Sequence, residues 1–211
     1  MKKLLFLILF SISLPIIAQG NAAAIKLGSF SPGATDAGFI IGYEGGRYID
    51  QNFNFGWSVD WFHKNYVDKT LVESFNEIYG ISGGINELRA QTNLHDIPLM
   101  INATLKFPVA PRTKIYITGA IGAEILIVDY RNFENPDDNE LKGAFDFNWR
   151  LGVGGAYNIG PRSEVLLEMN YHNSEPSWTY EIDSPTIGKR TFERVYDMSG
   201  IMFRAGFRFY Y

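Results

Sequence analysis

The fold is decided by the stretch Phe53-Asn54-Phe55-Gly56-Trp57-Ser58-Val59-Asp60-Trp61, in which apolar and polar residues alternate one by one. Successive side chains of an extended chain point to opposite faces, so the five apolar residues share one face. The opposite face carries asparagine, glycine, serine and aspartate. The stretch therefore predicts a β-strand with one apolar face and one polar face.

The same alternation recurs along most of the chain. It is clear in seven segments, at about 38–49, 52–64, 97–107, 115–128, 145–158, 164–172 and 201–211, and weak in an eighth at about 24–30. The connections at Asp50-Gln51, 110–113 and 159–163 are tight, and they carry the turn-forming residues Pro111, Gly160 and Pro161. Longer polar stretches run from Tyr66 to His95, from Tyr130 to Gly143 and from Asn173 to Glu193, whereas the connection at 31–36 is short. Short turns at one end and longer loops at the other are typical of outer-membrane barrels.

The polar faces indicate which side of the sheet is inside. They combine glycines with charges of both signs, at Glu44, Asp60, Lys106, Glu124, Asp146, Arg150, Glu168, Arg204 and Arg208. The interior of an eight-stranded barrel is just wide enough for side chains to fill, and it would not hold the aromatic faces. We therefore expect an all-β fold, an eight-stranded antiparallel up-and-down transmembrane β-barrel. The alternative is a soluble barrel of the lipocalin kind with the faces reversed.

Several tryptophans and tyrosines on the apolar faces fit the aromatic girdles of such a barrel. They are Tyr43, Trp57, Trp61, Trp149, Tyr157 and Tyr171.

The N-terminus predicts export. Lys2 and Lys3 precede an apolar run of 14 residues at 4–17, which is shorter than the ~20 residues of a spanning helix. We expect residues 1–18 to be a signal peptide cleaved after Ala18, with a barrel domain at 19–211. The chain has no cysteine, and its net charge of −4 becomes −6 without Lys2 and Lys3. Disulfides are excluded, and the negative charge argues against a nucleic-acid partner.

The final residues, Phe203-Arg204-Ala205-Gly206-Phe207-Arg208-Phe209-Tyr210-Tyr211, support a more specific comparison. Over nearly its whole length the chain resembles small bacterial outer-membrane barrels of the OmpA/OmpX-like class. The resemblance implies location in the outer membrane, contact with its lipid and lipopolysaccharide, and a closing strand whose Phe207, Phe209 and Tyr211 are read by the barrel-assembly machinery. Some relatives carry a peptidoglycan-binding domain after the barrel, and we expect this chain to lack it because nothing follows Tyr211. One barrel architecture hosts many activities, so the resemblance does not name one.

For the function we expect a non-enzymatic barrel with a structural or surface-interaction role, its lumen plugged by the nine charged residues. The first alternative is a narrow channel for ions or small solutes. The second is a lipid A-modifying hydrolase, because His172-Asn173-Ser174 is similar to the His-x-Ser core of outer-membrane deacylases. Glu175 stands where those enzymes carry asparagine, and by parity His172 points into the lumen. No carboxylate is evidently placed to orient His172, and Glu181 is the nearest downstream candidate.

The sequence predicts no catalytic, cofactor-binding or metal site. His63, His95 and His172 are scattered along the chain, and the acidic segment at 135–140 lacks the spacing of a calcium-binding loop. Partner recognition is expected on the long loops, since loops on a rigid scaffold vary freely.

Overall fold

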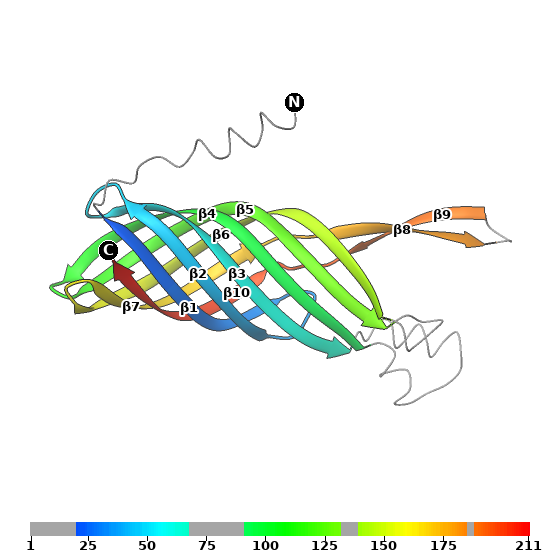
Figure 1. Cartoon of the computed structure of the whole chain (residues 1–211), viewed down its shortest axis with the longest axis horizontal. Helices are drawn as coiled ribbons and strands as arrows, with labels where there is room; N and C mark the ends of the chain where they lie inside the picture. The colour runs from blue at the N-terminus through cyan, green and yellow to red at the C-terminus, as the bar shows by residue number, and fades with distance from the viewer. Residues whose placement is uncertain (1–19, 68–90, 132–138, 185–187) are drawn as a thin grey trace, which may run out of the picture.

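Eight strands of the computed structural model close into one antiparallel barrel in the order β1-β10-β7-β6-β5-β4-β3-β2 (Figure 1). The structure describes residues 20–67, 91–131, 139–184 and 188–211. The barrel strands are β1 (Asn21–Pro32), β2 (Gly38–Tyr48), β3 (Phe53–Val67), β4 (Gln91–Ala110), β5 (Thr113–Arg131), β6 (Asn139–Gly160), β7 (Ser163–Asn173) and β10 (Gly200–Tyr210). Each pairs with its neighbour in sequence, except that β10 joins β7 to β1 and closes the wall. The predicted eight-stranded barrel is confirmed.

The apolar faces point outward along every strand, as the alternation predicts. Trp57 and Phe147 are 52% and 60% exposed, and Phe207 lies on the same outer surface. Glu124 and Arg150 are buried in the lumen, with 0% and 3% exposure. In the described residues no helix is long and apolar enough to cross a membrane.

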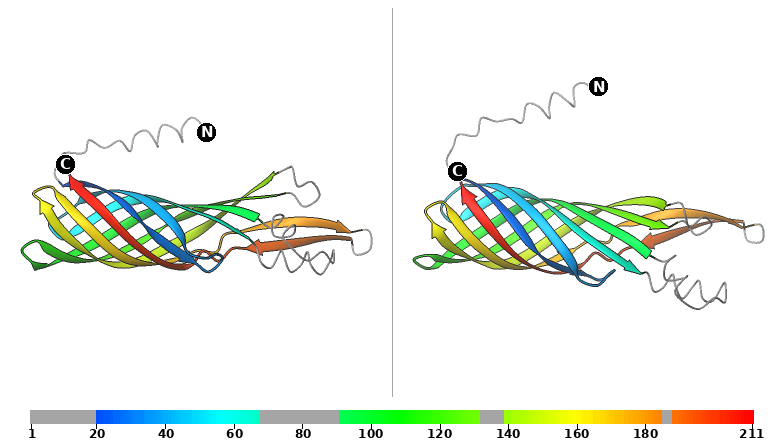
Figure 2. Two further views of the ribbon diagram at one scale, coloured as in Figure 1. Left: turned by 90° about the horizontal axis from the view of Figure 1, so that it is seen from below. Right: turned by 60° about the horizontal axis from the view of Figure 1, so that its bottom comes forward.

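The three tight turns lie at one end of the barrel, together with the end of β10 (Figure 2). At the opposite end the wall is uneven. Strands β4, β5 and β6 have 20, 19 and 22 residues, whereas β1, β2, β7 and β10 have 11 or 12. The long strands therefore reach past the short ones at the end that we assign to the cell exterior, because outer-membrane barrels have short periplasmic turns.

Three of the expected loops are partly wrong, because they contain strand. β3 runs to Val67 and β4 starts at Gln91; β5 runs to Arg131 and β6 starts at Asn139. The segment from Asn173 to Glu193 completes β7 and then forms a hairpin of β8 (Ser177–Ser184) and β9 (Gly188–Val195). The hairpin projects beyond the barrel (Figure 2). A two-stranded ribbon that projects beyond the barrel needs no lipid-facing side, so alternation does not reveal it.

Some predictions lie outside the described residues. These are the signal peptide at 1–18, the central part of the segment from Tyr66 to His95, and the acidic segment at 135–138. Asn139 and Glu140 of that segment begin β6.

Glycines let neighbouring strands lie close together on the lumen side, and Gly122 of β5 is a clear case. A Cβ atom on Gly122 would lie 2.0 Å from the carbonyl oxygen of Leu99 in β4. Gly119 faces outward on the same strand, and the nearest atom to its Cβ would be a side-chain atom of Leu151 at 3.6 Å.

We expect Gly122→Ala to lower the free energy of unfolding by about 1–3 kcal/mol, because the backbone of β4 would have to move. Gly119→Ala is the matched control and should leave it unchanged within about 0.5 kcal/mol. Urea unfolding from lipid vesicles, followed by tryptophan fluorescence, measures both. Equal effects of the two substitutions would contradict this account of strand packing.

Candidate functional site

The charged lumen brings together most of the residues singled out from the polar faces. Eight of the nine are buried in it: Glu44, Asp60, Lys106, Glu124, Arg150, Glu168, Arg204 and Arg208. Asp146 is different, because it is half-buried at the outer mouth and accepts hydrogen bonds from Ser174 Oγ and the Glu175 amide. Strand parity places these side chains, since each occupies an inward position next to outward apolar residues.

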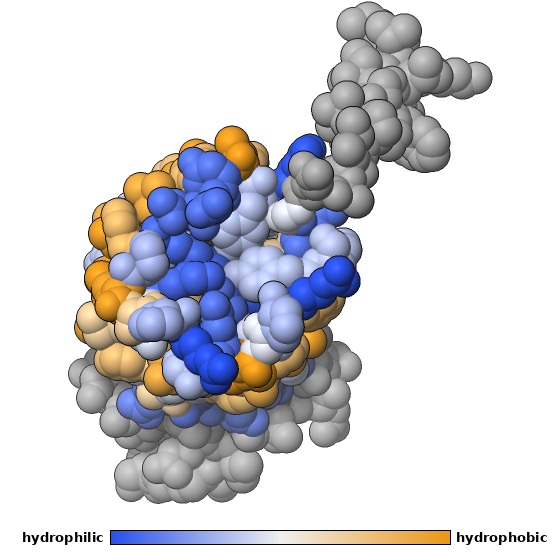
Figure 3. Space-filling view, turned by 90° about the vertical axis from the view of Figure 1, so that its left-hand side faces the viewer, coloured by the Kyte–Doolittle hydropathy of each residue, from blue (hydrophilic) through white to orange (hydrophobic). Residues whose placement is uncertain are grey.

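Glu164 organises the periplasmic part of the lumen. Its carboxylate lies 2.7 Å from Lys106 Nζ, 2.8 Å from Lys114 Nζ and 3.5 Å from Arg208 Nη1. Lys106 also donates to the Tyr210 hydroxyl at 2.7 Å, and its ammonium lies 4.8 Å from the centroid of the Tyr48 ring. The periplasmic mouth is thus filled by paired charges and two tyrosine rings, and hydrophilic residues cover it in Figure 3.

Lys26 links the two carboxylates in the middle of the lumen. Its ammonium lies 2.5 Å from Glu44 and 2.9 Å from Glu168. Glu44 also lies 3.0 Å from Arg208, and the Tyr116 hydroxyl donates to Glu168 at 2.9 Å. Each charge here therefore contacts at least one group of opposite sign.

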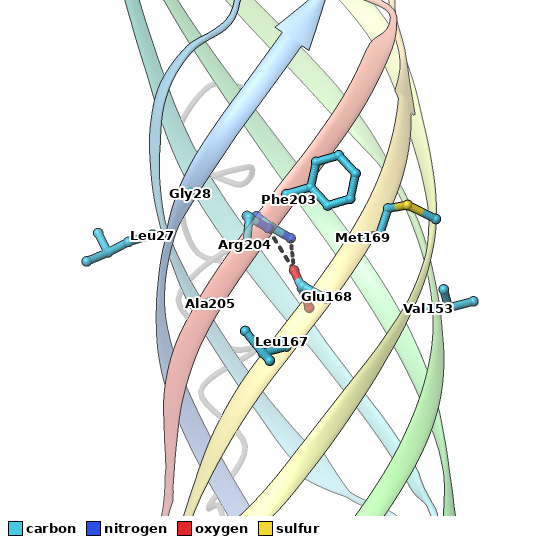
Figure 4. A pocket seen from close by; sticks show the side chains of 9 residues that line it. All are labelled: Leu27, Gly28, Val153, Leu167, Glu168, Met169, Phe203, Arg204 and Ala205. Atoms are coloured by element: carbon cyan, nitrogen blue, oxygen red, sulfur yellow. Dashed lines mark hydrogen bonds and ion pairs between the residues drawn. The ribbon is translucent and has the colours of Figure 1, made fainter.

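Arg204 connects this middle layer to the outer half. It lies 2.6 Å from Glu168 and 2.7 Å from Asp60, and Asp60 is also bound by Arg150 at 2.5 Å. Figure 4 shows the Arg204–Glu168 pair on the lumen side, while Leu27, Val153, Met169 and other apolar side chains point outward.

These contacts form one continuous series of alternating charges, which we call the charge ladder. It consists of Arg150, Asp60, Arg204, Glu168, Lys26, Glu44, Arg208, Glu164, Lys106 and Lys114. Hydrogen bonds between ionised groups are stronger than neutral ones, and the removal of one buried partner leaves the other uncompensated. The ladder joins β1, β2, β3, β4, β5, β6, β7 and β10 through the lumen.

A second polar group lies between the ladder and the outer mouth, and it contains Asp96, Glu124, Asn148 and His172. Glu124 Oε2 lies 2.6 Å from His172 Nε2 and accepts a hydrogen bond from Asn148 Nδ2 at 3.2 Å. Both oxygens of Asp96 lack a hydrogen-bond partner among the described residues. The lumen is polar up to this level.

An apolar cluster closes the outer mouth above that group. It includes Phe30, Ile40, Phe62, Leu94, Leu126, Val128, Ala144, Tyr196, Met198 and Met202. The segment that joins β9 to β10 supplies Tyr196 and Met198, and it is held by backbone hydrogen bonds from Met198 to Ser174 and from Gly33 to Ser199. Its backbone extends the barrel wall between the ends of β7 and β1, and the buried side chains of Tyr196 and Met198 fill the mouth.

Sequence reasoning missed Lys26, Lys114, Glu164 and Asp96. Glu164 and Asp96 occupy inward positions of strands whose outward faces are apolar, so the same period of two could have found them. Lys26 lies on β1, where alanine and glycine blur the alternation.

The hydrolase residues do not come together in this lumen. Sequence reasoning left His172 without an orienting carboxylate, and that was wrong, because Glu124 of β5 occupies the position. Ser174, however, donates to Asp146 at 3.3 Å, so the hydroxyl and the imidazole have different partners. Both side chains are buried beside the apolar cluster and away from outer lipid.

The three histidines do not form a metal site in the described part of the chain. His63 and His95 are cross-strand neighbours on the outer surface, with ring centroids 4.5 Å apart, and Trp61 Nε1 donates to His95 Nδ1. His172 lies inside the barrel. Among the described residues no group of three or more histidine, aspartate or glutamate side chains could hold a metal.

Phe207 and Phe209, two of the three residues expected to be the assembly signal, lie on the outward face of β10. The third, Tyr211, is exposed directly after that strand. Tyr43, Trp57, Trp61, Tyr157 and Tyr171 are also exposed on the outer surface, and Trp149 is half-buried there.

Comparison with solved structures finds the same architecture in several outer-membrane proteins. A major outer membrane protein from Thermus thermophilus aligns with a TM-score of 0.58 at 12% identity, over 92% of this chain and 100% of that one. OprG from Pseudomonas aeruginosa gives 0.57 at 10% identity, over 92% and 97%. Neisserial surface protein A gives 0.55 at 11% identity, over 90% and 96%.

The sequence itself carries the family assignment. No curated protein matches it. The model of the family described as "Outer membrane protein beta-barrel domain" matches residues 6–209, which is nearly the whole chain. With the closed barrel and its apolar outer surface, this match leads to one conclusion: the chain belongs to the outer membrane protein β-barrel domain family and resides in the outer membrane.

Proposed function

We propose that this chain is a non-enzymatic outer-membrane barrel with a structural or surface-interaction role and a lumen that does not conduct. The observation that carries the proposal is the charge ladder, which fills the lumen from the periplasmic mouth to Arg150. An eight-stranded barrel leaves little room beyond its own side chains. The apolar cluster at the outer mouth supports the same interpretation.

The charge balance of the lumen also favours a plug over a channel. The ladder holds six cations and four anions, and the buried carboxylates Asp96 and Glu124 above it make the formal total zero with His172 neutral. Pores select ions with rings of one sign or with carbonyl oxygens that replace hydration water. The charges of the ladder are already paired within 2.5–3.5 Å and leave no such ring.

The surface-interaction role rests on the outer end. The β8–β9 hairpin stands clear of the barrel wall, and its position on a rigid scaffold suits recognition of a partner (Figure 1). We also propose that lipid and lipopolysaccharide surround the apolar outer face and that the assembly machinery reads Phe207, Phe209 and Tyr211.

The first prediction from this proposal concerns conduction. The purified barrel, reconstituted into planar bilayers at high protein load, should leave the bilayer silent, because its charges are paired and its outer mouth is closed. A general porin added to the same bilayer serves as the positive control. Regular single-channel steps from the barrel alone would refute the plug and favour the narrow channel.

The second prediction tests the ladder as a structural element. Arg204→Met leaves Glu168 and Asp60 each without one cation and should lower the free energy of unfolding by about 3–5 kcal/mol. The double variant Arg204→Met/Glu168→Leu removes both partners of a pair and should lose less than the single variant. Urea unfolding measures both variants.

Asp36→Asn is the control for the ladder variant, because Asp36 is an exposed charge in the turn between β1 and β2. It should change the free energy of unfolding by less than about 0.5 kcal/mol. A loss in Arg204→Met no larger than that of this control would show that the ladder is not structural.

The third prediction tests orientation. Trypsin added to intact cells should cut the β8–β9 hairpin at Lys189 or Arg190, because isolated two-stranded ribbons are marginally stable and this one faces outward. Cuts at Arg112 and Arg162 should need permeabilised outer membranes. Mass spectrometry of the fragments identifies the cleavage sites. Cleavage at Arg112 in intact cells with an uncut hairpin would show that the assigned orientation is wrong.

A further inference from the structure

Arginine marks each of the three tight turns at the periplasmic end. Arg47 lies near the end of β2, Arg112 lies between β4 and β5, and Arg162 lies between β6 and β7. All three are exposed, and none forms an ion pair within the described part of the chain. The charge ladder does not include them, so the plug does not explain their presence.

An exposed aliphatic residue accompanies each of these arginines. Ile49, Val109 and Ile159 are 69%, 56% and 52% exposed, and each lies two or three residues from its arginine. They continue the outward apolar rows of their strands to the turns, as Phe107 and Val109 do on β4. In water this exposure has an unfavourable transfer free energy, whereas at the edge of a bilayer it does not.

The local charge at this end is positive. Asp50 is the one exposed side-chain carboxylate there among the described residues, and its Oδ1 accepts hydrogen bonds from the amides of Asn52 and Phe53 at 2.6 and 2.7 Å. This carboxylate is therefore committed to shaping its own turn. The arginines contrast with a chain that is acidic overall.

We propose that these three turns bind the phosphates of anionic phospholipids in the periplasmic leaflet of the outer membrane. A guanidinium binds phosphate oxygens in a bidentate manner, and long cationic side chains extend from the apolar region to the headgroups. The neighbouring aliphatic side chain enters the acyl region at the same place. We name the site, consisting of Arg47, Ile49, Val109, Arg112, Ile159 and Arg162, the periplasmic rim.

The arrangement favours lipids over a soluble polyanion. A soluble polyanion would use the arginines and leave the aliphatic residues in water, whereas a phospholipid contacts both. The turns lie on three separate strand pairs of the barrel wall, with the hydrophobic band around the hydrophilic mouth in Figure 3. Three separate sites fit three single lipids better than one large ligand.

Native mass spectrometry of the full barrel in detergent tests the proposal, with dioleoyl phosphatidylglycerol and dioleoyl phosphatidylcholine titrated as probes. The wild-type barrel should retain up to three phosphatidylglycerol molecules and bind them more tightly than phosphatidylcholine. Arg47→Gln/Arg112→Gln/Arg162→Gln should weaken phosphatidylglycerol binding by about tenfold or more, since each basic residue at an anionic surface contributes. Added salt should weaken wild-type binding in the same direction.

The matched control removes three positive charges from the other end, as Lys64→Gln/Lys142→Gln/Arg194→Gln, and should keep phosphatidylglycerol binding. Circular dichroism verifies that both triple variants are folded. If the rim triple variant does not fold, single variants replace it, and each should lose about one retained lipid.

Four results would overturn the proposal. They are unchanged binding in the rim variant, equal loss in the control variant, equal retention of the two lipids by the wild type, and displacement of phosphatidylglycerol by polyglutamate that itself remains bound.

Discussion

Backbone amide and carbonyl groups inside hydrocarbon have no water to bond to, and each one left unpaired costs several kcal/mol. A sheet meets this constraint only if it has no unpaired edge strand. Here β1 and β10 would be the two edges, and they pair with each other over eleven residue pairs. With eight strands, the closed ring leaves a lumen that side chains fill. The outer apolar surface and the inner polar one are both consequences of that ring.

Filling such a lumen requires charges to be paired. Six cations and six carboxylates occupy it, and most lie within 3.0 Å of an opposite charge. Among the described residues, two guanidinium nitrogens of Arg150 and both oxygens of Asp96 have no hydrogen-bond partner. These groups lie where the ladder gives way to the apolar cluster, so the polar network is least complete near the outer mouth.

The sequence predicts the wall better than the contents of the lumen. A period of two assigns Trp57, Asp60 and Arg150 to their faces without any knowledge of partners. It does not say that Asp60 contacts Arg150 and Arg204, because these pairs are 90 and 144 residues apart and depend on how the strands are staggered around the ring. Tyr196 and Met198 were also missed. They continue the inward row of Met202 beyond the start of β10, but Asp197 and Ser199 stand where outward apolar residues would mark a strand.

The ladder has a consequence for the order in which the wall is completed. Arg204 and Arg208 belong to the final strand, yet they neutralise carboxylates on β2, β3 and β7. Before that strand arrives, Asp60, Glu44 and Glu164 lack part of their counter-charge and need water around them. The open sheet therefore stays hydrated along its inner face. When β10 pairs with β7 and β1, it brings Arg204 and Arg208 into the lumen, and that water is expelled.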